Sequence, residues 1–405
     1  MSRAASVSVS RPAGGRFAEA LHTSSRTLIL IALVLLSRVL TFEEGGLAYF
    51  YLPRAWPQVV PSLFPPAGGF WFQVLLGPWA HWDGYWYLSI AQLGYVGRPL
   101  ATAFFPLYPI LIRLLGGSVG SALLVSLTAF GVGMVLLYRL AAAELGPRAA
   151  WFTVLALAFF PTAFYFNAVY PESLVLALTL ASLLWARSGR YGWAALTAAL
   201  VSAASVDGVL LAVPLLLYLW RTHQPYRRYA WVLAVPLGLL AYMFRLWQVF
   251  GSPLMFQSVQ SNWGRRLTWP WDTIWSALKN AWINLGNFIS IPHLFATGQP
   301  TTVISNVWNL AFFAFGVWLI VLAFRRLDRP IWWFCVLVLA VPFLDPSAGV
   351  PFMSMPRLLL AAPPLFIALG DWLSERSRAL KIYLGLSWAV GALLVALFTT
   401  AHWVA

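Results

Sequence analysis

Charged residues are scarce in this chain: only 9% of its 405 residues are Asp, Glu, Lys or Arg. A soluble domain carries roughly 25% charged residues, so the composition excludes a water-soluble protein. Cysteine occurs once, as Cys335, which excludes an internal disulfide and a metal site built from several thiolates. Apolar residues are abundant: 61% of the residues are hydrophobic, and 23 are tryptophans. The sequence therefore predicts an integral membrane protein.

The apolar residues are grouped in runs between residues 27 and 401. A membrane-spanning helix needs roughly 20 such residues, and the chain has room for about 11 of these helices. We therefore predict an all-α polytopic membrane protein with a single transmembrane domain over residues 27–405. Residues 1–26 carry arginines among Ser, Ala and Gly, and are predicted to form a disordered basic cytoplasmic tail.

The net charge of +14 is typical of nucleic-acid-binding proteins, but a membrane protein explains it better. Arginine and lysine collect in the cytoplasmic loops of membrane proteins. With a cytoplasmic N-terminus, the arginine-rich connections fall on alternate loops, for example at Arg187 and Arg190 and at Arg325 and Arg326. We expect no nucleic-acid partner. Two long loops, at about residues 42–119 and 248–301, are then predicted to be extracytoplasmic.

Both long loops mix apolar residues with Trp, Pro and Gly, which favours segments that lie on the membrane surface. Residues 85–93 are predicted to form an interfacial helix with Tyr85, Leu88 and Leu93 near one face. Residues 104–115 are expected to form a short re-entrant helix or an additional span. An additional span would reverse the side of every later loop and break the charge rule, so we favour the short helix.

This topology gathers most of the acidic residues on the extracytoplasmic side, although the chain has only 12 of them. An arginine fork matches a phosphate in charge and shape, and a carboxylate can accept the proton of a hydroxyl. The pattern predicts a site for an anionic ligand beside a reacting hydroxyl. The acids are Glu43, Glu44, Asp83, Glu172, Asp207, Asp272 and Asp345, and the arginines are Arg265, Arg266 and Arg357.

Six of these seven acids also have a structural interpretation. Asp83 could cap the helix that follows it, and Glu172 could interact with the dipole of a helix start. Asp207 and Asp345 are typical turn residues, and the Glu43-Glu44 pair could be a solvated surface. No metal-site spacing, phosphate-binding loop or nucleotide fingerprint is present, so we expect no metal and no cofactor.

Eight short motifs follow one another along the membrane domain. They are Trp82-Asp83-Gly84, Ile90-Ala91, Gly94-Tyr95, Ala103-Phe104-Phe105-Pro106-Leu107-Tyr108-Pro109, Tyr170-Pro171-Glu172-Ser173, Phe250-Gly251-Ser252-Pro253, Trp263-Gly264-Arg265 and Ser354-Met355-Pro356-Arg357. In sequence and order they resemble motifs of the PIG-V-like mannosyltransferases, which are GT-C glycosyltransferases of the kind that adds the second mannose of GPI anchors. The resemblance covers most of the membrane domain and indicates a prokaryotic member.

The resemblance implies a GT-C-like helical bundle that transfers a hexose, expected to be mannose, from a polyprenyl- or dolichyl-phosphate sugar. The acceptor would be a hydroxyl of a glycan or glycolipid, on the extracytoplasmic side of a prokaryotic plasma membrane, and the transfer would invert the anomeric centre. Asp83 is implied as the catalytic acid residue of the first external loop. Glu43 and Glu44 compete with it, because other GT-C groups use an acidic pair after the first helix.

Roles for further residues follow from this reaction. Arg357, Arg265 and Arg266 are predicted to bind the donor phosphate. Substrate contacts are predicted for Trp82, Tyr85, Tyr87, Glu172, Asp207 and Trp263, with Glu43 and Glu44.

Two other classes of protein remain open. A transporter or flippase of lipid-linked sugars would also carry charged residues in its membrane domain, although the two halves of this chain show no inverted repeat. A structural subunit of a larger membrane complex would use the external loops for docking.

Overall fold

The computed structural model describes residues 13–55, 69–288, 302–402 and 404. Within these ranges every extended element is a helix, and the only β-type pairings are two isolated bridges, which join Ser347 to Arg265 and to Val350. The first half contains α1 (Ala13–Tyr51), α2 (Phe70–Leu75), η2 (Gly77–Ala80), α3 (Asp83–Leu93), η3 (Pro99–Ala103), α4 (Leu107–Leu114), α5 (Val119–Leu145), α6 (Pro147–Ala158), η4 (Ala163–Asn167), α7 (Glu172–Arg187), α8 (Tyr191–Ala204), η5 (Val206–Leu211) and α9 (Ala212–Arg221).

The second half continues the helical bundle. It contains η6 (Tyr226–Ala234), α10 (Leu237–Phe250), α11 (Met255–Ser258), η7 (Val259–Trp263), α12 (Pro270–Phe288), α14 (Thr302–Phe324), α15 (Arg329–Leu344), α16 (Met355–Leu358), η8 (Leu359–Ala361), α17 (Leu365–Ser374) and α18 (Ser377–Thr399). The predicted all-α membrane fold is confirmed.

Three helices of the described chain are long and apolar enough to cross a membrane: α5, the Ser305–Phe324 part of α14, and α18. Two bent helix pairs raise this number to five if each pair is one span. One is η6 with α10, bent by 42°, and the other is Met355–Ala361 with α17, bent by 91°. The remaining predicted spans lie in α1, which is 39 residues long, and in helices of fewer than 18 residues, so the number of about 11 spans stays a prediction.

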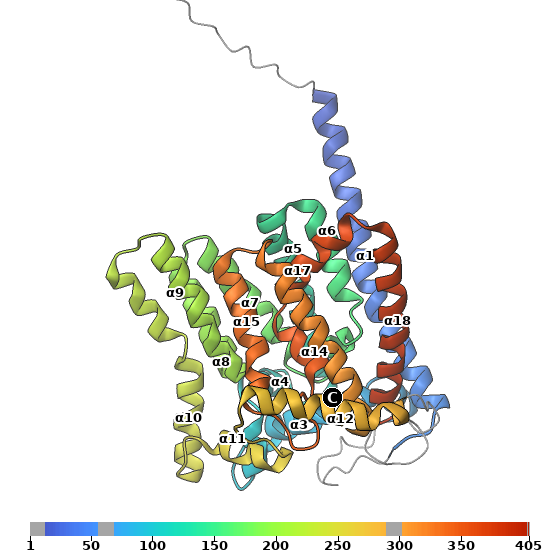
Figure 1. Cartoon of the computed structure of the whole chain (residues 1–405), viewed down its shortest axis with the longest axis vertical. Coiled ribbons are helices and arrows are strands. Elements are labelled where there is room, and N and C mark those ends of the chain that lie inside the picture. Colours follow the sequence, from blue (N-terminus) through green and yellow to red (C-terminus); the bar gives the residue numbers. More distant parts are fainter. Residues whose placement is uncertain (1–12, 56–68, 289–301, 403, 405) are drawn as a thin grey trace, which may run out of the picture.

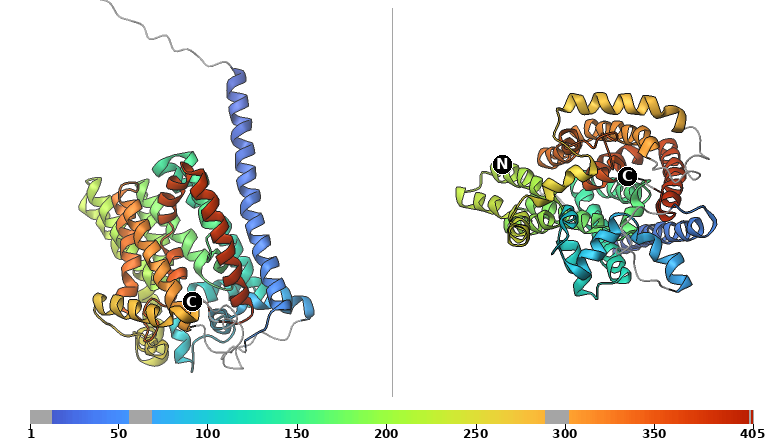
Figure 2. Two further views of the ribbon diagram at one scale, coloured as in Figure 1. Left: turned by 45° about the vertical axis from the view of Figure 1, so that its right-hand side comes forward. Right: turned by 90° about the horizontal axis from the view of Figure 1, so that it is seen from below.

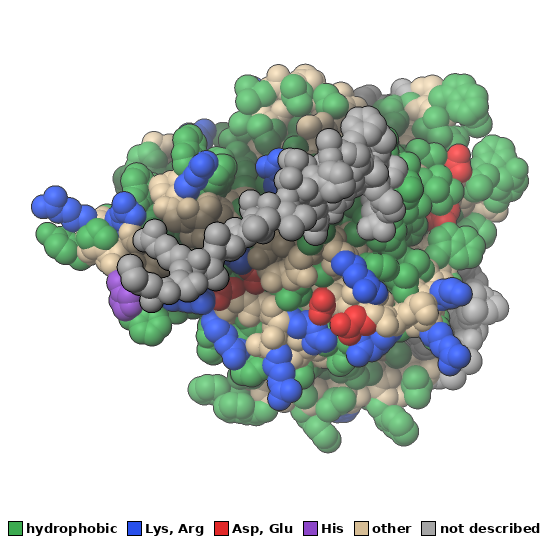
Figure 3. All heavy atoms as spheres, turned by 90° about the horizontal axis from the view of Figure 1, so that it is seen from above, with side chains coloured by type: hydrophobic (Ala, Val, Ile, Leu, Met, Phe, Trp, Pro, Cys, Tyr) green, Lys and Arg blue, Asp and Glu red, His purple; other side chains and the backbone are tan. Residues whose placement is uncertain are grey.

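The long helices run along the bundle, whereas α3, α4, α11 and α12 lie at the end away from the start of α1 (Figure 1). These four belong to the predicted extracytoplasmic loops. At the opposite end, Lys and Arg side chains are spread over the face seen in Figure 3. The orientation of the chain in the membrane stays a prediction from the charge rule.

α12 crosses the end of the bundle instead of following its axis (Figures 1 and 2). It exposes Trp271, Trp275 and Trp282 at 62%, 70% and 79%, and Trp271 stacks on Trp269 with their rings 5.0 Å apart. Exposed tryptophans on a helix across the bundle are typical of an interfacial helix.

Some local predictions need correction. α1 begins at Ala13, so the backbone is helical within the segment predicted to be a disordered tail. α3 forms where a helix was predicted, but Tyr85 and Leu88 are only 2% and 5% exposed, because they pack inside the protein and not in lipid. The segment 104–115 contains the eight-residue α4, which is too short to span a bilayer, so here the favoured prediction of a short helix agrees with the structure.

Arg38 of α1 makes hydrogen bonds to the irregular segment between α6 and α7. Its guanidinium is buried, donates to the carbonyl oxygens of Ala158 and Ala163 at 2.6 Å and to Asn167 Oδ1 at 2.8 Å, and lies 4.7 Å from the ring centre of Phe130. A charge inside a membrane domain is costly unless it has such partners. The carbonyl oxygens freed by the irregular backbone are thereby satisfied, and the segment leading to Glu172 is fixed.

Candidate active site

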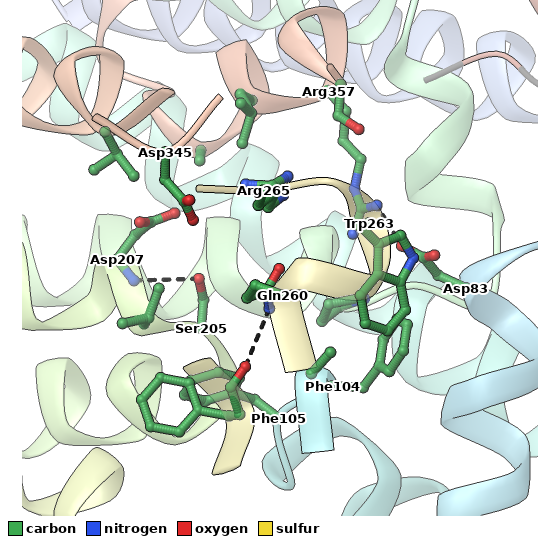
Figure 4. Close-up of a pocket in the computed structure, with 18 of the residues that line it drawn as sticks. Asp83, Phe104, Phe105, Ser205, Asp207, Gln260, Trp263, Arg265, Asp345 and Arg357 are labelled. Carbon is green, nitrogen blue, oxygen red and sulfur yellow. Dashed lines mark hydrogen bonds and ion pairs between the residues drawn. The ribbon is translucent and has the colours of Figure 1, made fainter. Parts of the chain in front are cut away.

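A cavity of about 490 Å³ lies at the end of the bundle that carries α3, α11 and η7. It gathers four acids and two arginines, although only 9% of the chain is charged. Asp207 and Asp345 lie on one side of the cavity, Asp83 and Arg357 lie on the other, and Arg265 lies between them (Figure 4). We describe the charged side chains as two groups: Asp83 and Glu172 with their shared partner Arg357, and Asp207 and Asp345 with Arg265.

The first group is built around Arg357. Its Nη1 donates to Asp83 Oδ2 at 2.5 Å, and its Nε donates to Glu172 Oε1. The side chains of Arg357, Asp83 and Glu172 are 21%, 23% and 11% exposed. Two carboxylates therefore share one guanidinium in a site with little water, where charge-assisted hydrogen bonds are strong.

Asp83 does not cap α3, because Trp82 holds the N-cap position and no side-chain cap is formed. Asp83 is the first residue of the helix, and its backbone N–H donates to the hydroxyl of Tyr170 at 3.1 Å. Trp82 has a φ of 57°, and Ser354, three residues before Arg357, has a φ of 69°. Strained backbone of this kind persists where the surroundings fix it, and it is frequent at functional sites.

Two tyrosines pack against Arg357. Neither was predicted from the sequence to be a site residue. The Cζ of Arg357 lies 4.8 Å from the ring centre of Tyr170 and 5.6 Å from that of Tyr165. Cations bind the faces of aromatic rings, so the two rings help hold the guanidinium in place. Tyr170 directly precedes Pro171-Glu172, and its position beside Glu172 is the one sequence feature that could have indicated a role in the site.

Aromatic side chains line the cavity beside the first group. Tyr87, Phe104 and Trp263 belong to the lining, and the rings of Phe104 and Trp263 meet edge to face at 6.0 Å. Trp263 lines the cavity together with Asp83 and Arg357, and the three are labelled in Figure 4. Flat apolar rings beside carboxylates offer both the stacking surface and the hydrogen-bond acceptors that a sugar ring can use.

The second group is held by a contact between two loops. Arg265 pairs with Ser347 through an isolated bridge, and the N–H of Ala348 donates to the carbonyl of Gly264 at 2.8 Å. Gly264 has a φ of 69°, and a Cβ at this position would lie 3.2 Å from the nitrogen of Ala348. Glycine is therefore the residue that allows this approach, which sets the position of Arg265.

Arg265 is half-buried, and in the described part of the chain its guanidinium makes no hydrogen bond and no ion pair. Figure 4 shows it between the Asp207–Asp345 side and Arg357. Burial lowers the pKa of Arg265, and Asp345 and Asp207 counteract this. The sequence predicted the same role for Arg265 and Arg357, but their partners in the structure differ.

Asp207 and Asp345 point toward each other across the second side of the cavity (Figure 4). Burial raises the pKa of Asp207 to about 6, against the effects of Arg265 and of a hydrogen bond with Ser205. Burial also raises the pKa of Asp345, which Arg265 counteracts. Both residues lie at helix ends, as predicted, but they also line the cavity. Perturbed carboxyl groups in a cavity are typical of functional sites.

Other predicted site residues lie outside the cavity lining. Glu43 is exposed, and Glu44 accepts a hydrogen bond from Trp388 Nε1 at 2.9 Å, where α1 lies beside α18 (Figure 2). Arg266 is exposed, and Trp82 and Tyr85 are not among the lining residues. The lining contains the other predicted residues: Asp83, Tyr87, Glu172, Asp207, Trp263, Arg265 and Arg357. Among the described residues, no three His, Cys, Asp or Glu side chains could together hold a metal ion.

Comparison with known proteins gives similarity in structure alone. No protein-family model and no curated protein sequence matches the chain. An oligosaccharyltransferase of Archaeoglobus fulgidus is similar with a TM-score of 0.43 and 15% identity, over 89% of this chain and 53% of that one. ArnT from Cupriavidus metallidurans, solved with undecaprenyl phosphate, is similar with a TM-score of 0.41 and 16% identity, over 93% of this chain and 76% of that one.

The chain thus spans about half the length of the archaeal oligosaccharyltransferase. Similarity at this level assigns no activity to the chain. The resemblance to PIG-V-like mannosyltransferases also remains a prediction.

Proposed function

We propose that this membrane protein is a glycosyltransferase that moves a hexose from a lipid phosphate to an acceptor hydroxyl. One observation carries the proposal. Asp83 lines the cavity, and its Oδ2 accepts a hydrogen bond from Arg357. Its Oδ1 has no hydrogen-bond partner in the described chain. The same cavity also holds Arg265, which has no ion pair among the described residues. A base with a free oxygen and a separate cation are the two groups that transfer from a phosphate requires.

The reaction is a single displacement. Asp83 Oδ1 accepts the proton of the acceptor hydroxyl while the hydroxyl oxygen bonds to the anomeric carbon. The bond from that carbon to the phosphate oxygen breaks, and its electron pair leaves with the lipid phosphate. The products are an inverted glycoside, a lipid phosphate and a protonated Asp83, which later releases its proton to water.

Arg265 is assigned to the leaving phosphate. Arg357 already has two carboxylate partners, so a phosphate would have to displace them, whereas the Arg265 guanidinium has no ion pair to break. A preorganised cation at the developing charge lowers the barrier because it needs no reorganisation. Trp263 and Tyr87 are assigned to stacking on the sugar, and Asp207 with Asp345 to its hydroxyls.

The finer identity of the reaction follows the motif resemblance. It favours mannose as the sugar, polyprenyl- or dolichyl-phosphate mannose as the donor, and a glycan or glycolipid as the acceptor. The charge distribution supports a cytoplasmic N-terminus and an extracytoplasmic active site, and the resemblance to a prokaryotic member favours the plasma membrane.

A lipid-linked-sugar transporter is the second candidate, and one feature favours it. Arg357 lies in a helix pair bent by 91°, and broken helices with charged residues are frequent at transporter sites. Transport would move the intact lipid-linked sugar between leaflets and leave its glycosidic bond unbroken.

The test uses purified full-length protein in vesicles that contain polyprenyl-phosphate mannose and a glycan acceptor. We expect transfer by the wild type, and loss of at least about 100-fold in Asp83→Asn, since general bases contribute this much or more. Asp272→Asn, which changes an exposed acid of α12 outside the cavity, is the matched control and should keep full transfer. Near-normal transfer by Asp83→Asn would refute the role of Asp83, and Glu43→Gln would then test the competing base. Leaflet exchange without bond cleavage would favour the transporter.

A further inference from the structure

Glu172 has a contact pattern that binding of a sugar hydroxyl does not explain. Its Oε1 accepts from Arg357 Nε, while its Oε2 is buried and has no hydrogen-bond partner in the described chain, although Glu172 belongs to the cavity lining. An oxygen that substrate cannot reach does not bind a hydroxyl of that substrate. The carboxylate therefore acts on Arg357, and a buried charge left half-satisfied needs such a reason.

This inference rests on the proposed function, in which Asp83 is the base. We propose that Glu172 is a positioning residue that neutralises Arg357, so that Arg357 orients Asp83 without suppressing its affinity for a proton. The three side chains form one unit, in which Glu172 supplies the charge balance, Arg357 the orientation and Asp83 the free oxygen.

The need for balance follows from electrostatics. An arginine in direct contact with a carboxylate lowers the pKa of that carboxylate by about 1–3 units and weakens it as a base. A second carboxylate on the same guanidinium offsets this effect, because it repels negative charge on Asp83 while it cancels the positive charge of Arg357. With Glu172 present, the unit carries one net negative charge, which the free oxygen of Asp83 presents to the cavity.

Other groups around Asp83 do not supply this balance. Three tyrosine hydroxyls surround the unit, and burial raises their pKa values so that they stay neutral; they are Tyr87, Tyr165 and Tyr170. Arg265 also acts on Asp83, but Asp345 and Asp207 face Arg265 and oppose its charge. Among the groups that act on Arg357, Glu172 and Asp83 are the carboxylates, so Glu172 is the acid that can compensate it without taking part in the proton transfer.

The experiment measures the pH dependence of single-turnover transfer by the full-length protein with polyprenyl-phosphate mannose. In Glu172→Gln we expect the acidic limb of the profile to move to lower pH by about one unit, because Arg357 then acts on Asp83 alone. The plateau rate should fall by up to about tenfold, which is the loss that one pKa unit of base strength can cause. The KM for the donor should stay within about twofold of the wild type, since Glu172 makes no substrate contact.

Two further variants separate charge balance from folding. The double variant Glu172→Gln/Arg357→Gln removes one charge of each sign, so its acidic limb should return to the wild-type position. Glu172→Asp keeps the charge and should keep the wild-type limb even if its rate falls. Asp272→Asn serves again as the control outside the cavity.

The outcomes are distinct. An unmoved limb in Glu172→Gln together with a raised donor KM would mean that Glu172 binds a hydroxyl, and would overturn the proposal. A double variant that keeps the shifted limb, or a Glu172→Asp variant that shifts it as Glu172→Gln does, would overturn it as well. Absence of wild-type transfer, or full transfer by Asp83→Asn, would instead remove the proposed function itself.

Discussion

Replacing Arg265 is the sharpest test of where the donor phosphate binds, because its neighbour Arg266 offers a matched comparison. Both residues have the same charge and lie in one loop, but Arg265 lines the cavity and Arg266 is exposed outside it. We therefore compare Arg265→Gln with Arg266→Gln. Both variants remove one positive charge from the same region, so long-range attraction to an anionic lipid changes similarly.

The magnitude follows from the partners of Arg265. A hydrogen bond to a charged group contributes about 1.5–3 kcal/mol, which corresponds to a change in Kd of roughly 10- to 150-fold. Asp207 and Asp345 already oppose part of the charge of Arg265, which favours the lower half of this range. We expect Arg265→Gln to weaken polyprenyl-phosphate binding by about 10- to 30-fold. Arg266→Gln should weaken it less than about threefold, as is usual for exposed charges.

The assay is equilibrium binding of polyprenyl phosphate to detergent-solubilised protein at two salt concentrations. Salt screens exposed charges more than half-buried ones, so the difference between the two variants should persist at the higher concentration. Equal losses in both variants, or no loss in Arg265→Gln, would refute the assignment of Arg265. A larger loss in Arg357→Gln than in Arg265→Gln would return the phosphate to Arg357.

Two further predictions concern stability. Arg38→Met should lower the free energy of unfolding in detergent by about 1–3 kcal/mol, since it leaves buried acceptors unpaired, whereas Arg139→Met at an exposed site should change it by less than about 0.5 kcal/mol. Similar values for the two variants would contradict the anchoring role of Arg38. Because the pKa of Asp207 is raised to about 6 in the fold, its charged form destabilises the protein as pH rises from about 4 to 6. Asp207→Asn should therefore be more stable than the wild type at pH 7.5, by up to about 3 kcal/mol, and equal to it near pH 4; equal stability at both pH values would contradict this.

The class of fold could be predicted because lipid imposes strong rules on sequence. The scarcity of charge and the long apolar runs predict a helical membrane protein, which the structure confirms. The interior of the external loops was harder to predict. α3 has apolar residues near one face, as an interfacial helix does, and sequence alone does not tell whether lipid or protein covers that face. Tyr85 and Leu88 turned out to face protein.

The members of the site could be predicted better than their connections. The acids and arginines of the external side include all six charged residues that line the cavity. Their pairing depends on contacts between residues more than 180 positions apart, such as Arg357 with Asp83 and with Glu172. No local pattern predicts such contacts, so the sequence analysis gave Arg265, Arg266 and Arg357 the same role, binding of the donor phosphate.

The partners of these three arginines make them chemically different. Arg357 is held by two carboxylates, Arg265 faces the cavity without an ion pair, and Arg266 is exposed outside it. A cation that is already neutralised can orient a base, while a cation without an ion pair can receive a leaving phosphate. The proposed transfer uses both functions at separate points, since a phosphate bound to Arg357 would compete with Asp83 for the same guanidinium. The division of charge within the cavity is thus the feature on which the proposed transfer from a lipid phosphate depends.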